Sequence, residues 1–339
     1  MYFFFTYFDR HYLSRGLALY RSLNRHCRSF ALWVLCMDEL TRKVLSRMRL
    51  PSVYLISLED LEREDERLLE AKQNRSRIEY YFTCTPSLAL YILKRWPDTD
   101  VITYLDADLF FFTNPAPIYR ELGNGSILIV GHRFPPHLKH REIFGVYNVG
   151  WVSFRNDQHG LQSLRWWRER CLEWCYDHVE DGRFADQKYL DDWPSRFPNV
   201  VVLSHKGSGL APWNITNYTV RLDRDQVAID SQPLVFFHFH GLRQLREWLY
   251  DPGLASYGVR MDAVLKQGIY APYIRELRNA RRSAAQFADG FGGEKPIRGI
   301  VRDRDSPYSE TVRKTRNLVS AIKMFLSGKL LVVVGGRVV

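Results

Sequence analysis

The amino-acid sequence predicts an α/β fold whose central sheet is mostly parallel and flanked by helices. Short apolar runs at residues 2–7, 31–36 and 53–56 are typical of buried strands. Between them, residues 13–23 and 41–48 have the apolar spacing of helices that pack on one side. Because strands that alternate with helices usually pair in parallel, this order favours a parallel α/β sheet.

The same patterns place the remaining elements. A charged stretch at 59–79 indicates exposed helix and loop, residues 86–94 indicate a helix, and Thr41 is a candidate N-cap for the helix that follows it. Further strands are expected at 101–105, 127–130, 151–154, 200–203 and 234–239, and a Trp-rich helix at 161–179. We therefore expect an α/β domain over residues 1–250 and a basic, mainly helical extension over residues 251–339.

The formal net charge is +10, and much of it lies near the C-terminus. Residues 271–329 contain 13 Lys and Arg against 6 Asp and Glu. Nucleic acid, anionic lipid or a phosphorylated substrate would each suit such a surface. The sequence has neither zinc-finger spacing nor an RNA-recognition signature, so no nucleic-acid partner is expected. The five Cys are irregularly spaced in a long chain, which favours reduced core residues over a disulfide framework.

The first residues do not have the pattern of a signal peptide, because Asp9 and Arg10 interrupt the apolar run. No stretch reaches the ~20 apolar residues of a membrane-spanning helix. We therefore expect a cytoplasmic protein. Residues 318–334 mix apolar and Lys positions, and two interpretations stay open. This segment either contacts the inner face of the membrane peripherally or packs on its own domain.

Two carboxylates lie inside an otherwise apolar ribbon at residues 102–112. On an extended chain, residues i and i+2 point the same way, so Asp106 and Asp108 can face one point. Like charges this close are costly unless a cation compensates them, and Mg²⁺ or Mn²⁺ prefers such oxygen ligands together with substrate phosphates. The alternative is a solvated turn, which the apolar residues 109–112 disfavour. The pattern therefore predicts a divalent-metal site that holds a diphosphate at a strand end.

Several stretches resemble the GT-A-fold glycosyltransferases, in particular the retaining family 8 enzymes. The residues Tyr104-Leu105-Asp106-Ala107-Asp108-Leu109 resemble the Asp-x-Asp segment of that fold. Four more motifs follow in the family's order: Tyr147-Asn148-Val149-Gly150-Trp151-Val152, Ala185-Asp186-Gln187, Pro212-Trp213-Asn214 and His238-Phe239-His240-Gly241. The resemblance covers residues 2–241 and implies a mixed, mostly parallel Rossmann-like sheet. It departs from the family after Gly241, where the usual Lys-Pro-Trp is absent and only Arg243 or Arg246 could replace the Lys.

The resemblance also implies roles for individual residues. It implies that His238 joins Asp106 and Asp108 as a metal ligand. His240 lies at strand spacing from His238, so it is a second candidate, either as a metal ligand or as a hydrogen-bond partner of phosphate. Gln187 and Asp186 become the catalytic candidates, with Gln187 under the reacting carbon and Asp186 on donor-sugar hydroxyls. The donor-binding candidates are Thr6, Tyr7, Asp9, Asp106, Ala107, Asn148, Gly150, Gly241 and Arg243, and the acceptor-side candidates are Trp213, Asn214 and His205.

Structural alternatives stay open for several of these residues. Asp186 could be a helix N-cap, Asn148 could tie down a strand edge, and Trp213 could pack inward.

Together these features predict a glycosyltransferase that moves a sugar from a nucleotide diphosphate-sugar, expected to be a UDP-sugar, to a glycan, lipid-linked or other hydroxyl acceptor. The reaction is expected to need Mn²⁺ or Mg²⁺, and the resemblance implies retention of configuration. One alternative is a sugar-phosphate nucleotidyltransferase, although the N-terminal loop lacks the glycines it would need. The other is a non-catalytic protein on a transferase fold.

Overall fold

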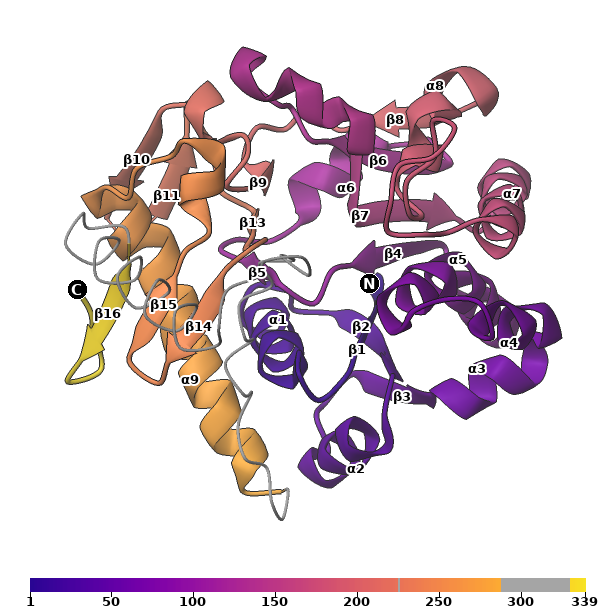
Figure 1. Ribbon diagram of the computed structural model, residues 1–339, viewed down its shortest axis with the longest axis horizontal. Coiled ribbons are helices and arrows are strands. Elements are labelled where there is room, and N and C mark those ends of the chain that lie inside the picture. The colour runs from indigo at the N-terminus through magenta and orange to yellow at the C-terminus, as the bar shows by residue number, and fades with distance from the viewer. Residues whose placement is uncertain (225, 288–329) are drawn as a thin grey trace, which may run out of the picture.

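A seven-stranded sheet forms the centre of the molecule in this computed structural model, which describes residues 1–224, 226–287 and 330–339 (Figure 1). The strand order is β3-β2-β1-β4-β7-β6-β8. Only β7 runs against its neighbours β4 and β6, whereas the other four pairs are parallel. The strands are β1 (Tyr2–Phe8), β2 (Phe30–Cys36), β3 (Val53–Ser57), β4 (Val101–Leu105), β6 (Ile127–Gly131), β7 (Tyr147–Arg155) and β8 (Val200–Val202). The predicted mixed, mostly parallel sheet is confirmed.

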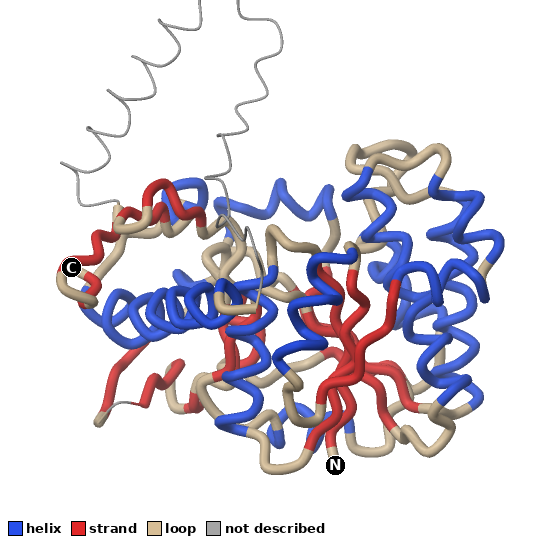
Figure 2. Tube along the Cα trace, turned by 90° about the horizontal axis from the view of Figure 1, so that it is seen from below, coloured by secondary structure: helices blue, strands red, loops and turns tan. Residues whose placement is uncertain are grey.

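Helices cover both faces of this sheet (Figure 2). One face carries α1 (Leu13–His26), α2 (Glu39–Met48) and α6 (Ala116–Leu122), and the other carries α3 (Leu58–Glu64), α4 (Glu66–Lys72), α5 (Arg77–Arg95), α7 (Gln158–Glu173) and α8 (Trp193–Arg196). Successive strand residues alternate between these layers, so that Phe4 packs in one core and Phe5 in the other. The inner strands β1, β2, β4, β6 and β7 are therefore largely buried on both sides, which explains their almost unbroken apolar sequences. The edge strands β3 and β8 are partly exposed.

A smaller strand cluster brings distant parts of the chain to the end of β4. In it, β13 (Phe236–His238) pairs antiparallel with β5 (Leu109–Phe111) and parallel with β9 (Ser208–Leu210). This pairing places His238 opposite Leu109, directly beside the carboxylate pair. A separate three-stranded sheet consists of β10 (Val220–Asp223), β11 (Gln226–Ile229) and β12 (Gln232–Pro233).

The part of the chain after residue 250 packs closely on the rest of the molecule. The helix α9 (Ala271–Ala285) lies against α1, and the carboxylate of Glu276 on α9 lies 3.0 Å from both Arg21 and Arg25 on α1. The ring of Tyr273 stacks on Phe239 with a centroid distance of 3.8 Å. Short helical turns precede α9: η4 (Leu254–Tyr257) and the π-helix η5 (Leu265–Tyr270). Two further 3₁₀ helices, η1 (Pro136–Phe144) and η2 (Lys188–Asp192), flank the site region, and η3 (Ile215–Asn217) follows β9.

The C-terminal residues form strands, where we expected mainly helix. The strand β16 (Leu331–Val334) pairs with β15 (Leu249–Asp251), which pairs with β14 (Arg243–Arg246), and β17 (Arg337–Val338) follows β16. The β-branched valines of β16 suit the free edge of β15, and Leu331 and Val333 bury their side chains there. Of the segment 318–334, residues 318–329 lie outside the described residues. The domain boundary at residue 250 stays a prediction.

Two helices begin earlier than the sequence prediction placed them, and in both the N-terminal capping residue sets the start. The first turn of α2 is capped by Asp38, whose carboxylate accepts from the backbone N–H of Thr41 at 2.8 Å. Helix α5 begins at Arg77, well before Pro86, because Ser76 and Glu79 form a capping box. The predicted Trp-rich helix ends at Glu173, earlier than residue 179.

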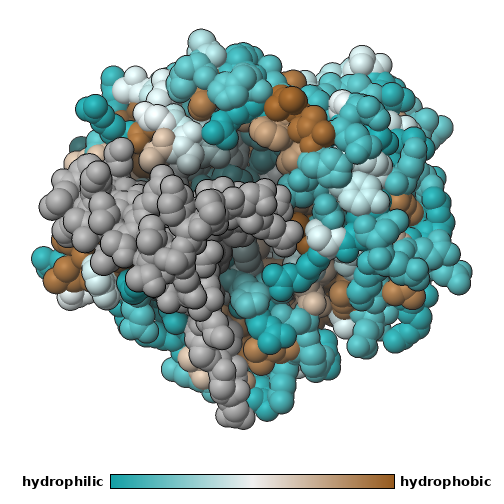
Figure 3. All heavy atoms as spheres, in the orientation of Figure 1, coloured by the Kyte–Doolittle hydropathy of each residue, from teal (hydrophilic) through white to brown (hydrophobic). Residues whose placement is uncertain are grey.

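The five Cys are free and buried, as predicted. The surface shown in Figure 3 is mostly hydrophilic. Among the described residues, no helix combines the length and apolarity needed to cross a membrane.

Candidate metal and substrate site

The carboxylate pair lies where β4 ends and before β5 begins. The backbone N–H of Asp106 donates to the carbonyl of Gly150 on β7 at 3.0 Å, and the carbonyl of Asp108 accepts from the N–H of Phe239 at 3.0 Å. Asp106 is therefore bonded to the strand β7, and Asp108 to the residue that follows β13. Because β7 runs antiparallel to β4, its first residues lie beside the last residues of β4, which brings Asn148 and Gly150 to the same place.

His238 completes a three-residue cluster with this pair. Its Nε2 lies 3.1 Å from Oδ1 of Asp108 and 3.5 Å from Oδ2 of Asp106. One ligand atom from each residue lies within 4.8 Å of the others, which is the spacing of atoms around one metal ion. The His238 side chain is only 5% exposed, and those of Asp106 and Asp108 are 33% and 14% exposed. The cluster is thus open on the Asp106 side.

The charges in this cluster depend on one another. Burial opposes ionisation of Asp108, but the charge and hydrogen bond of His238 prevail and lower its pKa to about 2, with a further contribution from Arg15. Burial and the charge of Asp108 raise the pKa of Asp106, although His238 counteracts this. The pKa of His238 is raised by Asp108 against the effect of its own burial. In the absence of a cation, a protonated imidazole would thus compensate the two carboxylates.

Asn148 determines which nitrogen of His238 faces the carboxylates. Its Oδ1 accepts from the backbone N–H of Gly150 at 3.0 Å and lies 3.2 Å from Nδ1 of His238. Its Nδ2 lies 3.2 Å from Oε1 of Gln187, an oxygen that also accepts from the N–H of Val149 at 3.4 Å. The two backbone N–H donors show which side-chain atoms of Asn148 and Gln187 are oxygens. Because Oδ1 of Asn148 is an acceptor, Nδ1 of His238 must carry the hydrogen when the ring is neutral. The lone pair is then on Nε2 and faces the two carboxylates, so the three residues fit a divalent ion.

Gly150 leaves the space that this arrangement needs. A Cβ at this position would lie 2.6 Å from Oδ1 of Asn148 and 2.9 Å from the ring of His238, closer than real Cβ contacts. The glycine of the predicted motif is therefore required for packing around His238.

Gln187 and Asp186 lie near the cluster of Asp106, Asp108 and His238, and each has its own hydrogen-bond partners. Gln187 donates from Nε2 to the carbonyl of Phe144 at 2.9 Å while its Oε1 faces Asn148. Asp186 is 4% exposed and accepts from Oγ1 of Thr85 at 3.2 Å, and it does not cap the helix η2. Burial, followed by the charge of Asp106, raises the pKa of Asp186 to about 8.

The end of β1 lies on the same side as Asp186. Tyr7 stacks on Tyr104 with a centroid distance of 5.5 Å, and its hydroxyl lies 3.3 Å from Oγ1 of Thr85. Tyr104 in turn donates to Asp106 at 2.8 Å. Thr6 is fully buried, and its Oγ1 has no hydrogen-bond partner in the part of the chain that the structure describes. These contacts connect Asp106 to Asp186 through hydroxyl groups.

Asp9 lies in the loop after β1. Its carboxylate accepts from the N–H of His11 at 2.9 Å and from the hydroxyl of Tyr81 at 3.3 Å. Ala107, between the two metal-site carboxylates, is buried.

The acceptor-side candidates are more involved in structure than we expected. Trp213 is 5% exposed, and its ring packs edge-on against the rings of His238 and His240, with centroid distances of 5.2 and 5.5 Å. It therefore forms a wall of the site. The side-chain amide of Asn214 hydrogen-bonds to three backbone groups. It accepts from the N–H of Ala211 and donates to the carbonyls of His132 and Gly209. His205 is buried, and its Nδ1 lies 3.1 Å from the hydroxyl of Ser208.

The residues after His240 also have structural partners. Gly241 has a φ of +78°, which favours glycine, and Arg243 forms an ion pair with Asp251 across the β14–β15 hairpin. Arg243 is therefore engaged beside the site, and the side chain of Arg246 bonds only to the carbonyl of Leu245 among the described residues.

Sequence reasoning missed three residues that hold this site together. In the sequence, Tyr104 falls in a predicted strand, Thr85 lies just before the helix predicted at 86–94, and His132 lies after the strand predicted at 127–130. His132 lies 3.3 Å from Nδ2 of Asn148, and burial lowers its pKa to about 3. No local pattern distinguishes such residues, because their partners are far away in sequence.

Comparison with known proteins places the chain in a family. No protein-family model matches it. The chain is 32% identical over 295 residues to the uncharacterized protein YfnD of Bacillus subtilis (strain 168), covering 85% of this chain and 94% of YfnD. It is 34% identical over 239 residues to the uncharacterized protein YfnF of the same organism, covering 68% of this chain and 78% of YfnF. The chain belongs to the YfnD/YfnF family.

The fold of this YfnD/YfnF family member resembles a solved glycosyltransferase. The galactosyltransferase LgtC, in complex with donor and acceptor sugar analogs, superposes with a TM-score of 0.52 and 15% sequence identity. The match covers 85% of this chain and 97% of LgtC. Together with the sheet topology, it confirms the GT-A fold that the sequence motifs implied.

Proposed function

We propose that this chain is a glycosyltransferase that transfers a sugar from a nucleotide diphosphate-sugar, a UDP-sugar, to a hydroxyl acceptor. The observation that carries the proposal is the cluster of Asp106, Asp108 and His238 at the end of β4 of a GT-A fold. Ligands tend to bind at the carboxyl ends of the strands in an open α/β sheet. The donor and acceptor sugar analogs bound by LgtC support the same class of substrate.

In this proposal, Asp106, Asp108 and His238 hold Mn²⁺ or Mg²⁺. The ion would neutralise the negative charge that develops on the leaving diphosphate. Asn148 keeps Nε2 of His238 available, and Trp213 packs against the ring and limits its rotation. The end of β1, with Thr6, Tyr7 and Asp9, receives the base and ribose, next to Ala107, Gly150 and Gly241.

The chemical step joins the acceptor oxygen to the anomeric carbon while the bond from that carbon to the diphosphate oxygen breaks. Gln187 lies under the reacting carbon and has no ionisable group, so the proton of the acceptor hydroxyl passes to the leaving phosphate. Asp186 binds a hydroxyl of the donor sugar. This arrangement favours transfer from the face of the leaving group, with retention of configuration.

The acceptor is a glycan or a lipid-linked hydroxyl compound, and Trp213 forms the wall nearest to it. For a lipid-linked acceptor, the basic C-terminal region would hold the protein at the inner face of the membrane from the cytoplasm. Flotation of the full chain with anionic and neutral vesicles tests this contact. Binding to neither kind of vesicle would exclude it.

The decisive experiment is a screen of UDP-sugars for hydrolysis and transfer with Mn²⁺, with Mg²⁺ and with EDTA. We expect turnover of at least one donor with metal and a loss of at least 100-fold with EDTA or in Asp108→Asn. Asp98→Asn, which changes an exposed carboxylate before β4, should retain full activity. Full activity of Asp108→Asn in EDTA would contradict the proposal. Release of pyrophosphate from a nucleoside triphosphate would favour a nucleotidyltransferase.

A further inference from the structure

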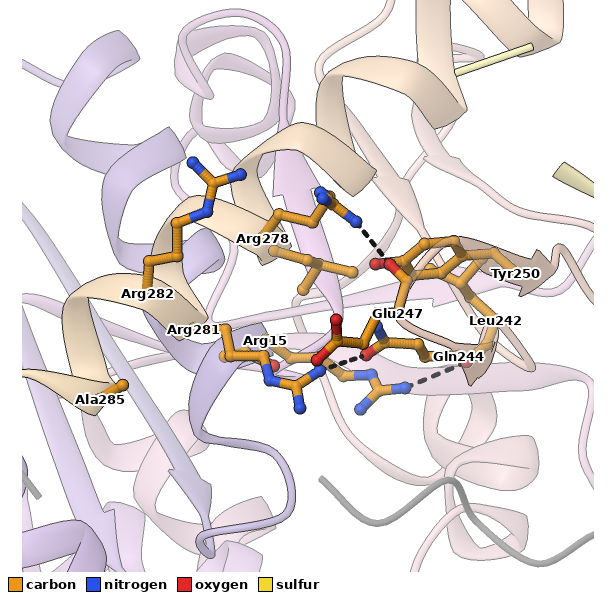
Figure 4. Close-up of a pocket in the computed structure, with 11 residues that line it drawn as sticks. Arg15, Leu242, Gln244, Glu247, Tyr250, Arg278, Arg281, Arg282 and Ala285 are labelled. Atoms are coloured by element: carbon orange, nitrogen blue, oxygen red, sulfur yellow. Dashed lines mark hydrogen bonds between the residues drawn. The ribbon is translucent and has the colours of Figure 1, made fainter. Parts of the chain in front are cut away.

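A cavity lies between α1, the β14–β15 hairpin and α9 (Figure 4). Its volume is about 280 Å³. Apolar side chains of the hairpin and α9 form part of its lining, and arginines come from α1 and α9. The lining residues are Ser14, Arg15, Leu242, Gln244, Glu247, Tyr250, Leu277, Arg278, Arg281, Arg282 and Ala285.

Positive charge exceeds negative charge among the described residues that line this cavity. Four arginines line it there against one acidic residue, Glu247. Arg278 donates to the backbone carbonyl of Glu247, and Arg281 to the side-chain oxygen of Gln244 at 3.3 Å, so both use neutral acceptors. Within the described ranges, none of Arg278, Arg281 and Arg282 has a carboxylate oxygen within 4.0 Å.

Elsewhere on α9, by contrast, a carboxylate pairs with two arginines of α1. Glu276 of α9 lies 3.0 Å from both Arg21 and Arg25, so the contact between α9 and α1 carries its own counter-charge. In Figure 4, Arg278 and Arg281 point from α9 toward the hairpin. Cations that converge on one concave space and repel one another favour an anionic ligand in that space.

The cavity adjoins the candidate metal site through Arg15 and Leu242. Arg15 is 5% exposed and donates from Nη2 to the carbonyl of Leu242 at 3.0 Å. Its charge also contributes to the low pKa of Asp108. Leu242 follows His240 and Gly241 at the end of the segment that supplies His238. An anion in the cavity would therefore lie next to the reaction site.

We infer that this cavity binds a phosphate group of a substrate, held by the guanidinium groups of Arg15, Arg278 and Arg281. Guanidinium groups match phosphate oxygens with paired hydrogen bonds, and the apolar walls strengthen those bonds by excluding water. The phosphate belongs either to the donor diphosphate or to a phosphorylated acceptor. Its assignment to a substrate rests on the proposed function, whereas anion binding itself does not.

The test is calorimetric titration of the full chain with inorganic phosphate in EDTA at low ionic strength. We expect one saturable site, weakened about tenfold in Arg278→Gln and in Arg281→Gln. Arg281→Lys should keep part of the affinity. Arg275→Gln is the matched control, since Arg275 lies exposed on α9 outside the cavity, and it should change the affinity less than twofold. Absence of saturable binding, or an equal loss in Arg275→Gln, would overturn the inference.

Two further arms separate this site from the metal site and identify the source of the phosphate. Asp108→Asn should bind phosphate at least as tightly as the wild type, and a loss there would place the anion at the metal cluster instead. Titration with UDP and Mn²⁺ distinguishes the substrates. A tenfold weaker UDP affinity in Arg281→Gln assigns the cavity to the donor, and an unchanged UDP affinity assigns it to the acceptor. A glycosyltransferase activity that fails to appear leaves the phosphate result standing.

Discussion

Oδ1 of Asn148 lies 3.2 Å from Nδ1 of His238 and accepts the backbone N–H of Gly150 at 3.0 Å. The backbone donor excludes a flipped amide at Asn148, because a flip would bring two donors together. The orientation of a residue on β7 thus determines which nitrogen of a residue on β13 can bind a metal. Asn148 thus acts on the metal cluster through His238, although no hydrogen bond among the described residues joins its side chain to either carboxylate.

Replacing Asn148 by Leu should therefore weaken metal binding without unfolding the chain. Leu has a similar volume but removes the acceptor for Nδ1 of His238, and loss of such a partner typically costs 10- to 100-fold in metal affinity. Titration with Mn²⁺ followed by electron paramagnetic resonance measures the change. Asn148→Asp keeps an acceptor oxygen and should bind Mn²⁺ more tightly than the Leu variant. Equal affinity of wild type and Asn148→Leu would refute this role.

Gly150→Ala should disturb the same contact by crowding. The new Cβ would lie 2.6 Å from Oδ1 of Asn148, so that either Asn148 or His238 must move. We expect at least a tenfold loss of Mn²⁺ affinity and a lower melting temperature. Gly131→Ala on β6 is a suitable control, because the nearest atom to its Cβ would be 3.5 Å away on the side chain of Arg133. If Gly150→Ala and Gly131→Ala bind Mn²⁺ alike, the steric argument is wrong.

Asp186 should make the stability of the protein depend on pH. Its folded-state pKa is raised to about 8, mainly by burial and also by the charge of Asp106, so the folded state holds a proton that the unfolded state has released. Stability is then greatest below the ordinary carboxyl pKa and is lost as the pH rises toward 8. Between pH 5 and pH 8 the slope is at most about 1.4 kcal/mol per pH unit.

Urea unfolding at several pH values compares the wild type with Asp186→Asn, which has no such proton to lose. The stability of the wild type should fall relative to the variant as the pH rises from 5 to 8. Parallel curves for the two proteins would show that Asp186 is already ionised in the folded state at pH 5.

Glu276 should stabilise the contact between α9 and α1. Its side chain is 11% exposed and lies between Arg21 and Arg25. Glu276→Gln leaves two arginines without their counter-charge, so we expect a loss of about 1–3 kcal/mol in the free energy of unfolding. Glu39→Gln breaks a solvent-exposed pair with Arg42 and should cost clearly less than Glu276→Gln. Urea denaturation of both variants measures the difference, and equal costs would argue against a structural role for Glu276.

Local patterns predicted the main sheet well because its inner strands are buried on both faces. The strand at residues 101–105 was predicted with its observed bounds, and β1 and β2 within one residue at each end. Helix starts were predicted wrongly where a capping residue, rather than a proline or another candidate start residue, begins the helix. Pro86 suggested a helix start, although Ser76 and Glu79 carry the capping signal for α5. The C-terminal strand β16 was missed because its partner β15 lies about 80 residues earlier in the chain.

The sequence by itself determined the α/β fold, the acidic pair at the end of a strand and the motifs of the GT-A fold. These features depend on residues close together in the chain, whose spacing follows from strand and helix geometry. The resemblance also implied that His238 joins Asp106 and Asp108. Tertiary structure alone decided that Asn148 orients His238 and that arginines of α1 and α9 share a cavity. In these contacts, strand pairing and helix packing join residues more than 80 positions apart in the sequence. No local periodicity of the sequence predicts such contacts.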